Sequence, residues 1–206
     1  MKKFSDFLFF YKGHIIAVLV VVLICAFFLK DCKEKVNEDL TVSVLISNPA
    51  KGDSASLIAD DLAQAGKIPD FNGDGTSKAR INLITVPYQV KDESDLASQY
   101  QANIAVQTDN SAMFFIDEDL LEIYEEQDLF GDIGEIAQEL NDENLYIGEN
   151  GKALGISLKG NAFLEERGIV TETLYACFRN YEYVEVDEET EKIFDASVDV
   201  LKFIVQ

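Results

Sequence analysis

The stretch PDFNGDGTSK contains oxygen-bearing side chains at a spacing that is typical of calcium-binding loops. Asp70, Asn72 and Asp74 occupy alternate positions and a glycine follows, as at the start of a helix–loop–helix calcium site. Such a loop ends on a bidentate Glu, but the corresponding residue here is Ile81. Two interpretations stay open. The loop is either a weak calcium site with an incomplete set of oxygens, or a polar turn, because Gly, Asn and Asp tolerate positive φ.

Two other groups of residues could contact a ligand. Asp117 and Asp119 directly follow an apolar run, at a position where open α/β sheets often bind ligands. Their carboxylates would repel a phosphate and favour a cationic or neutral polar ligand, unless they only stabilise the first turn of a helix.

Tyr181 and Tyr183 lie on one side of an extended segment. They could stack on a sugar, line an interface or take part in ordinary cross-strand packing.

Residues for nucleophilic or zinc-dependent catalysis are scarce. The only histidine, His14, lies beside a long apolar run, so no Ser–His–Asp or Cys–His arrangement is expected in the rest of the chain. The usual His and Cys ligands of zinc are lacking, and no phosphate-binding GxxxxGK[ST] motif occurs. Carboxylates are abundant, but nothing singles out a pair for glycoside hydrolysis. The sequence therefore predicts a protein that is not an enzyme and that needs no cofactor, apart from the calcium ion considered above.

The net charge of −21 is concentrated in the larger part of the chain. From residue 40 onward there are 33 Asp and Glu against 11 Lys and Arg. Such a surface repels phosphate backbones, which argues against nucleic-acid binding, and favours solubility or cationic partners. The three cysteines, Cys25, Cys32 and Cys177, are too few for a disulfide framework.

A transmembrane anchor is predicted at residues 13–30. Fifteen consecutive apolar residues run from Ile15 to Leu29, flanked by aromatic residues and lysines that suit a membrane interface. No small-x-small cleavage site follows this run, which disfavours a cleaved signal peptide. Residues 1–12 are then expected in the cytoplasm, as is usual for short N-terminal anchors. A linker at 31–39 would lead to an extracytoplasmic domain at 40–206, so we expect a single-pass protein of the cell membrane.

Apolar patterns in residues 40–206 predict strands that alternate with amphipathic helices. Strands are expected at 40–47, 79–88, 112–116, 152–160 and 173–180, and helices at 54–66, 93–107, 117–127, 132–140 and 188–206, with a helical turn at 162–168. Leu96, Tyr100 and Ile104 share one face of the second helix. The predicted fold class is α/β, with a mixed, mostly parallel sheet that is covered by helices on both faces.

Segments 102–140 (ANIAVQTDNSAMFFIDEDLLEIYEEQDLFGDIGEIAQEL) and 151–161 (GKALGISLKGN), with the final helix, resemble bacterial extracellular solute-binding proteins of the type 2 periplasmic-binding class. The resemblance implies the family's order of a helix, a buried strand, a helix with an acidic start and a further short helix, with a strand following at 151–161. Family members close two lobes around a ligand, but only about a dozen residues separate Gly160 from Thr173, where the second lobe is inserted. The resemblance therefore implies a single lobe and transfers no binding residue. The chain is also similar to short membrane-anchored proteins of Gram-positive bacteria that carry a D-x-NGDG turn.

Together these patterns predict a membrane-anchored extracytoplasmic binding or scaffolding protein that contacts another envelope protein. The alternative is an accessory protein of a transport system, with a shallow site for a sugar, a peptide or a cation near residues 112–119.

Overall fold

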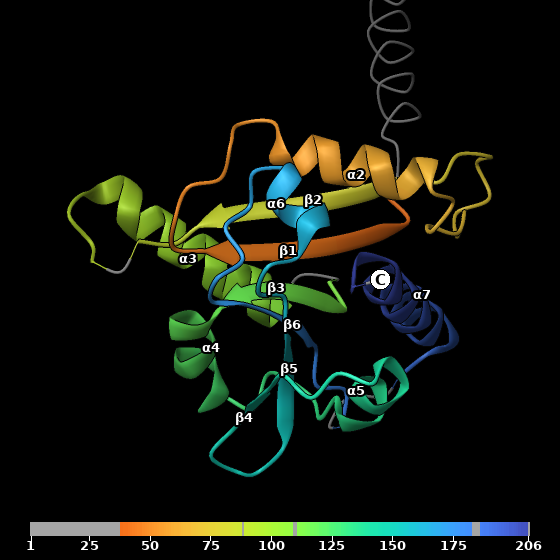
Figure 1. The fold of residues 1–206 in the computed structure, drawn as a ribbon. Helices are drawn as coiled ribbons and strands as arrows, with labels where there is room; N and C mark the ends of the chain where they lie inside the picture. Colours follow the sequence, from red (N-terminus) through yellow and green to blue (C-terminus); the bar gives the residue numbers. More distant parts are fainter. Residues whose placement is uncertain (1–37, 88, 109–110, 183–185, 206) are drawn as a thin grey trace, which may run out of the picture. The chain divides into compact units, whose positions relative to one another are not determined.

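The computed structural model describes residues 38–206, except for 88, 109–110, 183–185 and 206 (Figure 1). Residues Glu38–Gln206 form one compact unit. The predicted anchor at 13–30, the predicted cytoplasmic segment 1–12 and most of the predicted linker lie outside the described residues. Within the part of the chain that is described, no helix has both the length and the apolar character required to cross a membrane.

Six strands form one sheet in the order β2-β1-β3-β6-β5-β4 (Figure 1). Their bounds are Leu40–Ile46 for β1, Ala79–Thr85 for β2, Met113–Asp117 for β3, Leu145–Ile147 for β4, Ala153–Ser157 for β5 and Leu174–Phe178 for β6. β1 is parallel to both β2 and β3, whereas the pairs β3–β6, β6–β5 and β5–β4 are antiparallel. The expected α/β class and mixed sheet are confirmed.

The expectation of a mostly parallel sheet is wrong, because three of its five strand pairings are antiparallel. β4 and β5 are joined only by residues 148–152, and so short a connection permits a hairpin but no crossover between parallel strands. β4 itself was not expected, since it is a three-residue strand between polar segments. The pairing of β3 with β6 joins strands that are far apart in the sequence, and the apolar pattern of a strand carries no information on its direction.

Helices cover both faces of the sheet and enclose two apolar cores. Their bounds are Ser54–Gln64 for α2, Glu93–Thr108 for α3, Glu118–Glu125 for α4, Gly134–Leu140 for α5, Ala162–Glu166 for α6 and Glu188–Val205 for α7. α2, α5, α6 and α7 pack over one core, and α3 and α4 pack over the other. Every residue of β3 is buried between the two cores, as expected for a strand that is covered on both faces.

α3 packs on the sheet through small side chains and exposes its larger ones. Leu96, Tyr100 and Ile104 are 43%, 62% and 61% exposed, while the buried residues of this helix include Ala102, Ala105 and Val106. The four-residue spacing of the large apolar residues correctly predicted a helix. The same spacing did not identify the buried face, because alanine side chains are small and contribute little to an apolar sequence pattern.

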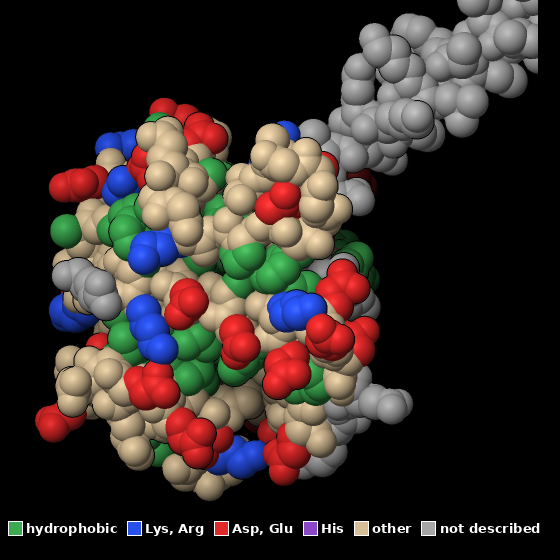
Figure 2. All heavy atoms as spheres, turned by 90° about the vertical axis from the view of Figure 1, so that its right-hand side faces the viewer, with side chains coloured by type: hydrophobic (Ala, Val, Ile, Leu, Met, Phe, Trp, Pro, Cys, Tyr) green, Lys and Arg blue, Asp and Glu red, His purple; other side chains and the backbone are tan. Residues whose placement is uncertain are grey.

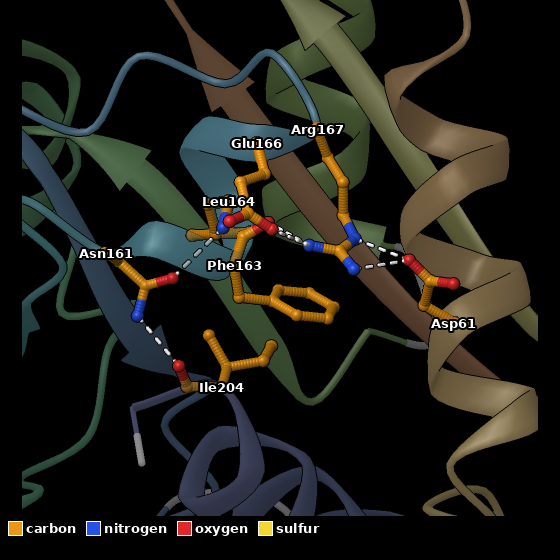
Figure 3. Close-up of polar contacts among 7 residues, drawn as sticks. All are labelled: Asp61, Asn161, Phe163, Leu164, Glu166, Arg167 and Ile204. Atoms are coloured by element: carbon orange, nitrogen blue, oxygen red, sulfur yellow. Dashed lines mark hydrogen bonds and ion pairs between the residues drawn. The ribbon is translucent and has the colours of Figure 1, made fainter.

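A polar network holds the short helix α6 between α2 and α7 (Figure 3). The Asn161 side chain, at the N-cap of α6, donates a 2.8 Å hydrogen bond to the carbonyl of Ile204 in α7. The Arg167 guanidinium binds the Asp61 carboxylate of α2, with an Nε–Oδ2 distance of 2.6 Å, and lies 3.7 Å from the centre of the Phe163 ring. In this chain, the connection between β5 and β6 therefore serves to pack helices of the same domain against one another.

Candidate functional site

The calcium-like loop is organised by hydrogen bonds within the loop itself. The Asp70 carboxylate accepts hydrogen bonds from the backbone amides of Gly73 (2.7 Å), Asp74 (3.2 Å) and Gly75 (2.8 Å). Gly73 and Gly75 have φ values of +70° and +85°, which glycine adopts without strain. The Asp74 carboxylate accepts from the hydroxyl and the amide of Thr76, and these bonds lower the pKa of Asp74. The aspartates thus fulfil the role expected of a polar turn.

Asp39, which the sequence did not suggest as important, anchors this loop to the start of β1. Its buried carboxylate accepts hydrogen bonds from the amides of Phe71 (2.9 Å), Asn72 (3.2 Å) and Lys78 (3.0 Å). Within the described part of the chain, no group of three or more Asp, Glu, His or Cys side chains is arranged to hold a metal ion. Calcium binding by Asp70, Asn72 and Asp74 stays a prediction.

Asp117 lies at the end of β3 and is used in structural hydrogen bonds. Its buried carboxylate accepts from the Ser47 amide (2.6 Å) and from the Thr173 hydroxyl (3.2 Å). Burial raises the pKa of Asp117, the nearby charge of Asp119 acts in the same direction, and the hydrogen bonds from Ser47 and Thr173 oppose the shift. Asp119 is exposed in the first turn of α4. Asp117 therefore offers little surface to a ligand at this edge of the sheet.

A groove of about 360 Å³ lies where β6 ends and α7 begins. We call it the aromatic groove, and its apolar lining consists of Ile133, Phe178, Tyr181, Val186 and Phe194. The Phe194 ring lies 5.2 Å from that of Phe178 and 6.2 Å from that of Tyr181, measured between ring centres. Tyr181 is partly buried, and this burial raises the pKa of its hydroxyl. The aromatic groove combines an apolar lining with a few polar groups at its margin, as small-molecule sites do.

Charged side chains at the margin of the aromatic groove are mainly acidic. Asp132, Glu182 and Glu191 contribute carboxylates, and the Lys152 ammonium lies 3.3 Å from the Glu182 carboxylate. Arg179 also lines the groove, but its guanidinium donates hydrogen bonds to carbonyl groups at and just beyond the end of α3, which covers the other face of the sheet. Figure 2 views the domain from the side on which α5 and α7 lie in Figure 1, and shows acidic side chains spread around exposed apolar ones.

A second hollow, of about 680 Å³, lies between α4 and the β4–β5 turn. Glu122, Glu125, Glu126 and Glu149 line it. The Glu125 carboxylate is already engaged, because it accepts hydrogen bonds from the Tyr146 hydroxyl (2.9 Å) and from the Glu149 amide. Tyr146 and Ile147 add some apolar surface, but the lining of this hollow is mainly polar and acidic, unlike that of most sites for organic ligands.

The structure separates the residues that the sequence suggested as ligand contacts. Tyr181 lies in the aromatic groove, whereas Tyr183 lies outside the described residues. Asp117 pairs with Leu174 at the start of β6, so it lies at the other end of this strand from Tyr181. Phe194 lies in α7, the final helix, and was not among the residues suggested as ligand contacts. No local signal shows that it meets Tyr181, because their contact depends on how α7 packs.

Comparison with known proteins does not identify a family for this chain. No protein-family model and no curated protein matches this chain. Among solved structures, it is similar to the ABC substrate-binding protein Lmo0181 from Listeria monocytogenes in complex with cycloalternan, with 16% sequence identity and a TM-score of 0.34. The match covers 57% of this chain and only 28% of that one. A likeness at this level is too weak to assign a ligand or a function.

The hydrogen bonds of the calcium-like loop generate a first prediction. Because its carboxylates already bind backbone amides, we expect millimolar calcium to change the melting temperature of the full-length chain by less than about 1 °C. Thermal unfolding with calcium and with a chelator measures this change. A larger rise that disappears in the double variant Asp70→Asn, Asp74→Asn, but persists in Asp92→Asn, Asp95→Asn, would instead establish a calcium site.

The environment of Asp117 generates a second prediction. Because the pKa of Asp117 is raised in the folded state, its contribution to stability is present below the unfolded-state pKa and is lost as the pH rises through the folded-state pKa. Asp117→Asn keeps an acceptor for the Ser47 amide and does not titrate. Its free energy of unfolding, relative to wild type, should therefore increase from about pH 4 upward.

Urea unfolding of the full-length chain over a pH series measures this difference. Asp119→Asn is the matched control, because Asp119 is exposed and its removal should leave most of the pH dependence in place. A difference between Asp117→Asn and wild type that stays constant with pH, or that decreases as the pH rises, would contradict the proposed effect of burial.

Proposed function

We propose that this chain is a membrane-anchored extracytoplasmic binding or scaffolding protein, and that its Glu38–Gln206 domain holds a ligand or a partner in the aromatic groove. The observation that carries the proposal is the groove itself. Its volume of about 360 Å³ lies within the range of small-molecule sites, and its lining is largely apolar with charged groups at the margin.

The chemistry of the domain supports binding rather than catalysis. The only histidine of the chain, His14, lies outside the described residues, so the aromatic groove has no imidazole from this domain to act as a general base. Cys177 is completely buried, and burial raises the pKa of its thiol, so little nucleophilic thiolate is present.

The form of the groove supports contact with a second molecule. The domain is one compact unit, and Val186 at the margin of the groove is 44% exposed, so one side of the site faces solvent. A ligand held there would keep part of its surface in water unless another protein covered it. This favours a scaffolding role beside another envelope protein.

The second candidate, an accessory binding protein of a transport system, is favoured by the match between the groove volume and a small ligand.

The apolar run from Ile15 to Leu29 supports a membrane anchor, and the strongly acidic composition of the rest of the chain suits a solvent-facing domain. Extracytoplasmic location follows from the usual orientation of short N-terminal anchors and is part of the proposal.

Cysteine labelling tests location and occupancy together. Val186→Cys places a thiol at the aromatic groove and Val170→Cys places one away from it, at a residue of similar exposure (48%). Both are made in the full-length chain with Cys25→Ser and Cys32→Ser, while the buried Cys177 adds no background. We expect a membrane-impermeant maleimide to label both variants on intact cells. Val186→Cys should react several-fold more slowly than Val170→Cys in cells, and equally fast after purification.

Two results would contradict the proposal. Labelling of both variants only after cell lysis would show that the domain is not extracytoplasmic. Equal labelling rates for the two variants, in cells as well as after purification, would show that nothing occupies the groove.

A further inference from the structure

We infer that the aromatic groove selects a small organic cation, that is, a ligand with an apolar body and a positively charged ammonium group. The inference rests on the proposed binding function and adds the chemical class of the ligand. It is carried by three features of the groove, namely the arrangement of its aromatic rings, the charges at its margin and its volume.

The aromatic rings are inclined steeply to one another. The planes of Tyr181 and Phe194 meet at 81°, and those of Phe178 and Phe194 meet at 59°. The face of an aromatic ring carries the negative part of its quadrupole and attracts a cation. Tyr181 and Phe194 are both partly exposed, so a ligand can reach them.

The charges at the margin favour a cation and disfavour an anion. Asp132, Glu182 and Glu191 provide three carboxylates. That of Glu182 is paired with the Lys152 ammonium, so the carboxylates of Asp132 and Glu191 are the ones that would attract a cation. The guanidinium of Arg179 is held by carbonyl groups near the end of α3. The negative charge of the whole domain adds to the local excess of carboxylates, so an anionic ligand would be repelled.

The volume of the groove favours a small molecule over a protein segment. About 360 Å³ lies near the lower end of the range for small-ligand pockets, which is enough for one aromatic or aliphatic group with its charged end. Val186 is exposed and Phe194 is partly exposed, and both contribute apolar surface beside Tyr181. The apolar body of the ligand would lie against these residues, while its ammonium group would lie between the ring faces and the carboxylates.

Three probes of similar size separate the contributions of shape and charge. These are 2-phenylethylammonium, its neutral analogue 2-phenylethanol, and the anion phenylacetate. Calorimetric titration of the full-length chain in a non-ionic detergent measures their dissociation constants, with a blank titration into detergent alone. We expect the ammonium probe to bind at least about fivefold more tightly than the alcohol, and phenylacetate to bind most weakly.

Substitutions then locate the site. Tyr181→Ala should weaken binding of the ammonium probe about fivefold or more, because it removes one ring face, while Tyr181→Phe should keep it. Glu191→Gln should weaken binding of the ammonium probe and leave that of the alcohol unchanged. Tyr100→Ala is the matched control, since Tyr100 is an exposed tyrosine on α3, over the opposite face of the sheet, and its loss should have no effect.

The outcomes distinguish failure of the inference from failure of the proposed function. If all three probes bind with similar affinity and Tyr181→Ala weakens them equally, the groove is a binding site but selectivity for cations is overturned. The inference is also overturned if Tyr100→Ala weakens binding as much as Tyr181→Ala does. If no probe binds while Val186→Cys is still protected in cells, the ligand class is wrong and the proposed function stands.

Discussion

The carboxylate of Asp117 joins the two halves of the sheet at the point where their directions differ. β3, which Asp117 ends, is parallel to β1 on one side and antiparallel to β6 on the other. Asp117 accepts one hydrogen bond from Ser47, which follows β1, and one from Thr173, which precedes β6. An unpaired carboxylate in this position would be costly, because burial penalises its charge. The position of the strand ends on both sides of β3 therefore depends on this residue.

This use of Asp117 decides where the domain can bind another molecule. In open α/β sheets, the carboxyl ends of parallel strands usually form the ligand site. Here that edge is bridged by Asp117 and its two partners. β6 runs in the opposite direction, so its carboxyl end lies at the other edge of the sheet, where the chain continues to Tyr181 and α7 begins. The aromatic groove forms at this end and is lined by Tyr181, which follows β6, and by Phe194 of α7.

Much of the fold could be predicted from local patterns, because each strand or helix carries its own apolar period. β1 and β3 lie almost where expected, and α2 ends at Gln64, shortly before Gly66, whose φ of +64° suits the residue that follows a helix. Features that depend on distant pairing could not be predicted in the same way. The direction of β6, the three-residue strand β4 and the exposure of Tyr100 on α3 all follow from tertiary packing.

Some residues of the candidate site could likewise be recognised from local patterns, whereas others depend on tertiary packing. Tyr181 could be recognised from the spacing of tyrosines in a segment that was predicted to be extended, but its neighbour Phe194 comes from α7, which the sequence indicated only as a final helix. Asp117 was recognised by its position directly after an apolar run, and it is the last residue of β3, although its hydrogen-bond partners could not be identified from the sequence. No sequence pattern marks Asp39 as important, since its buried carboxylate acquires three amide partners only when the loop after α2 folds back on it.

We place ligand binding at the carboxyl end of β6 and not at the edge that Asp117 closes. Methyl NMR of the full-length chain during titration with 2-phenylethylammonium distinguishes the two locations, because each has its own methyl groups. We expect the largest shifts at Ile133 and Val186, which line the aromatic groove. If the largest shifts occurred instead at Ile46 and Ile116, the neighbours of Ser47 and Asp117 in the chain, this placement would be wrong.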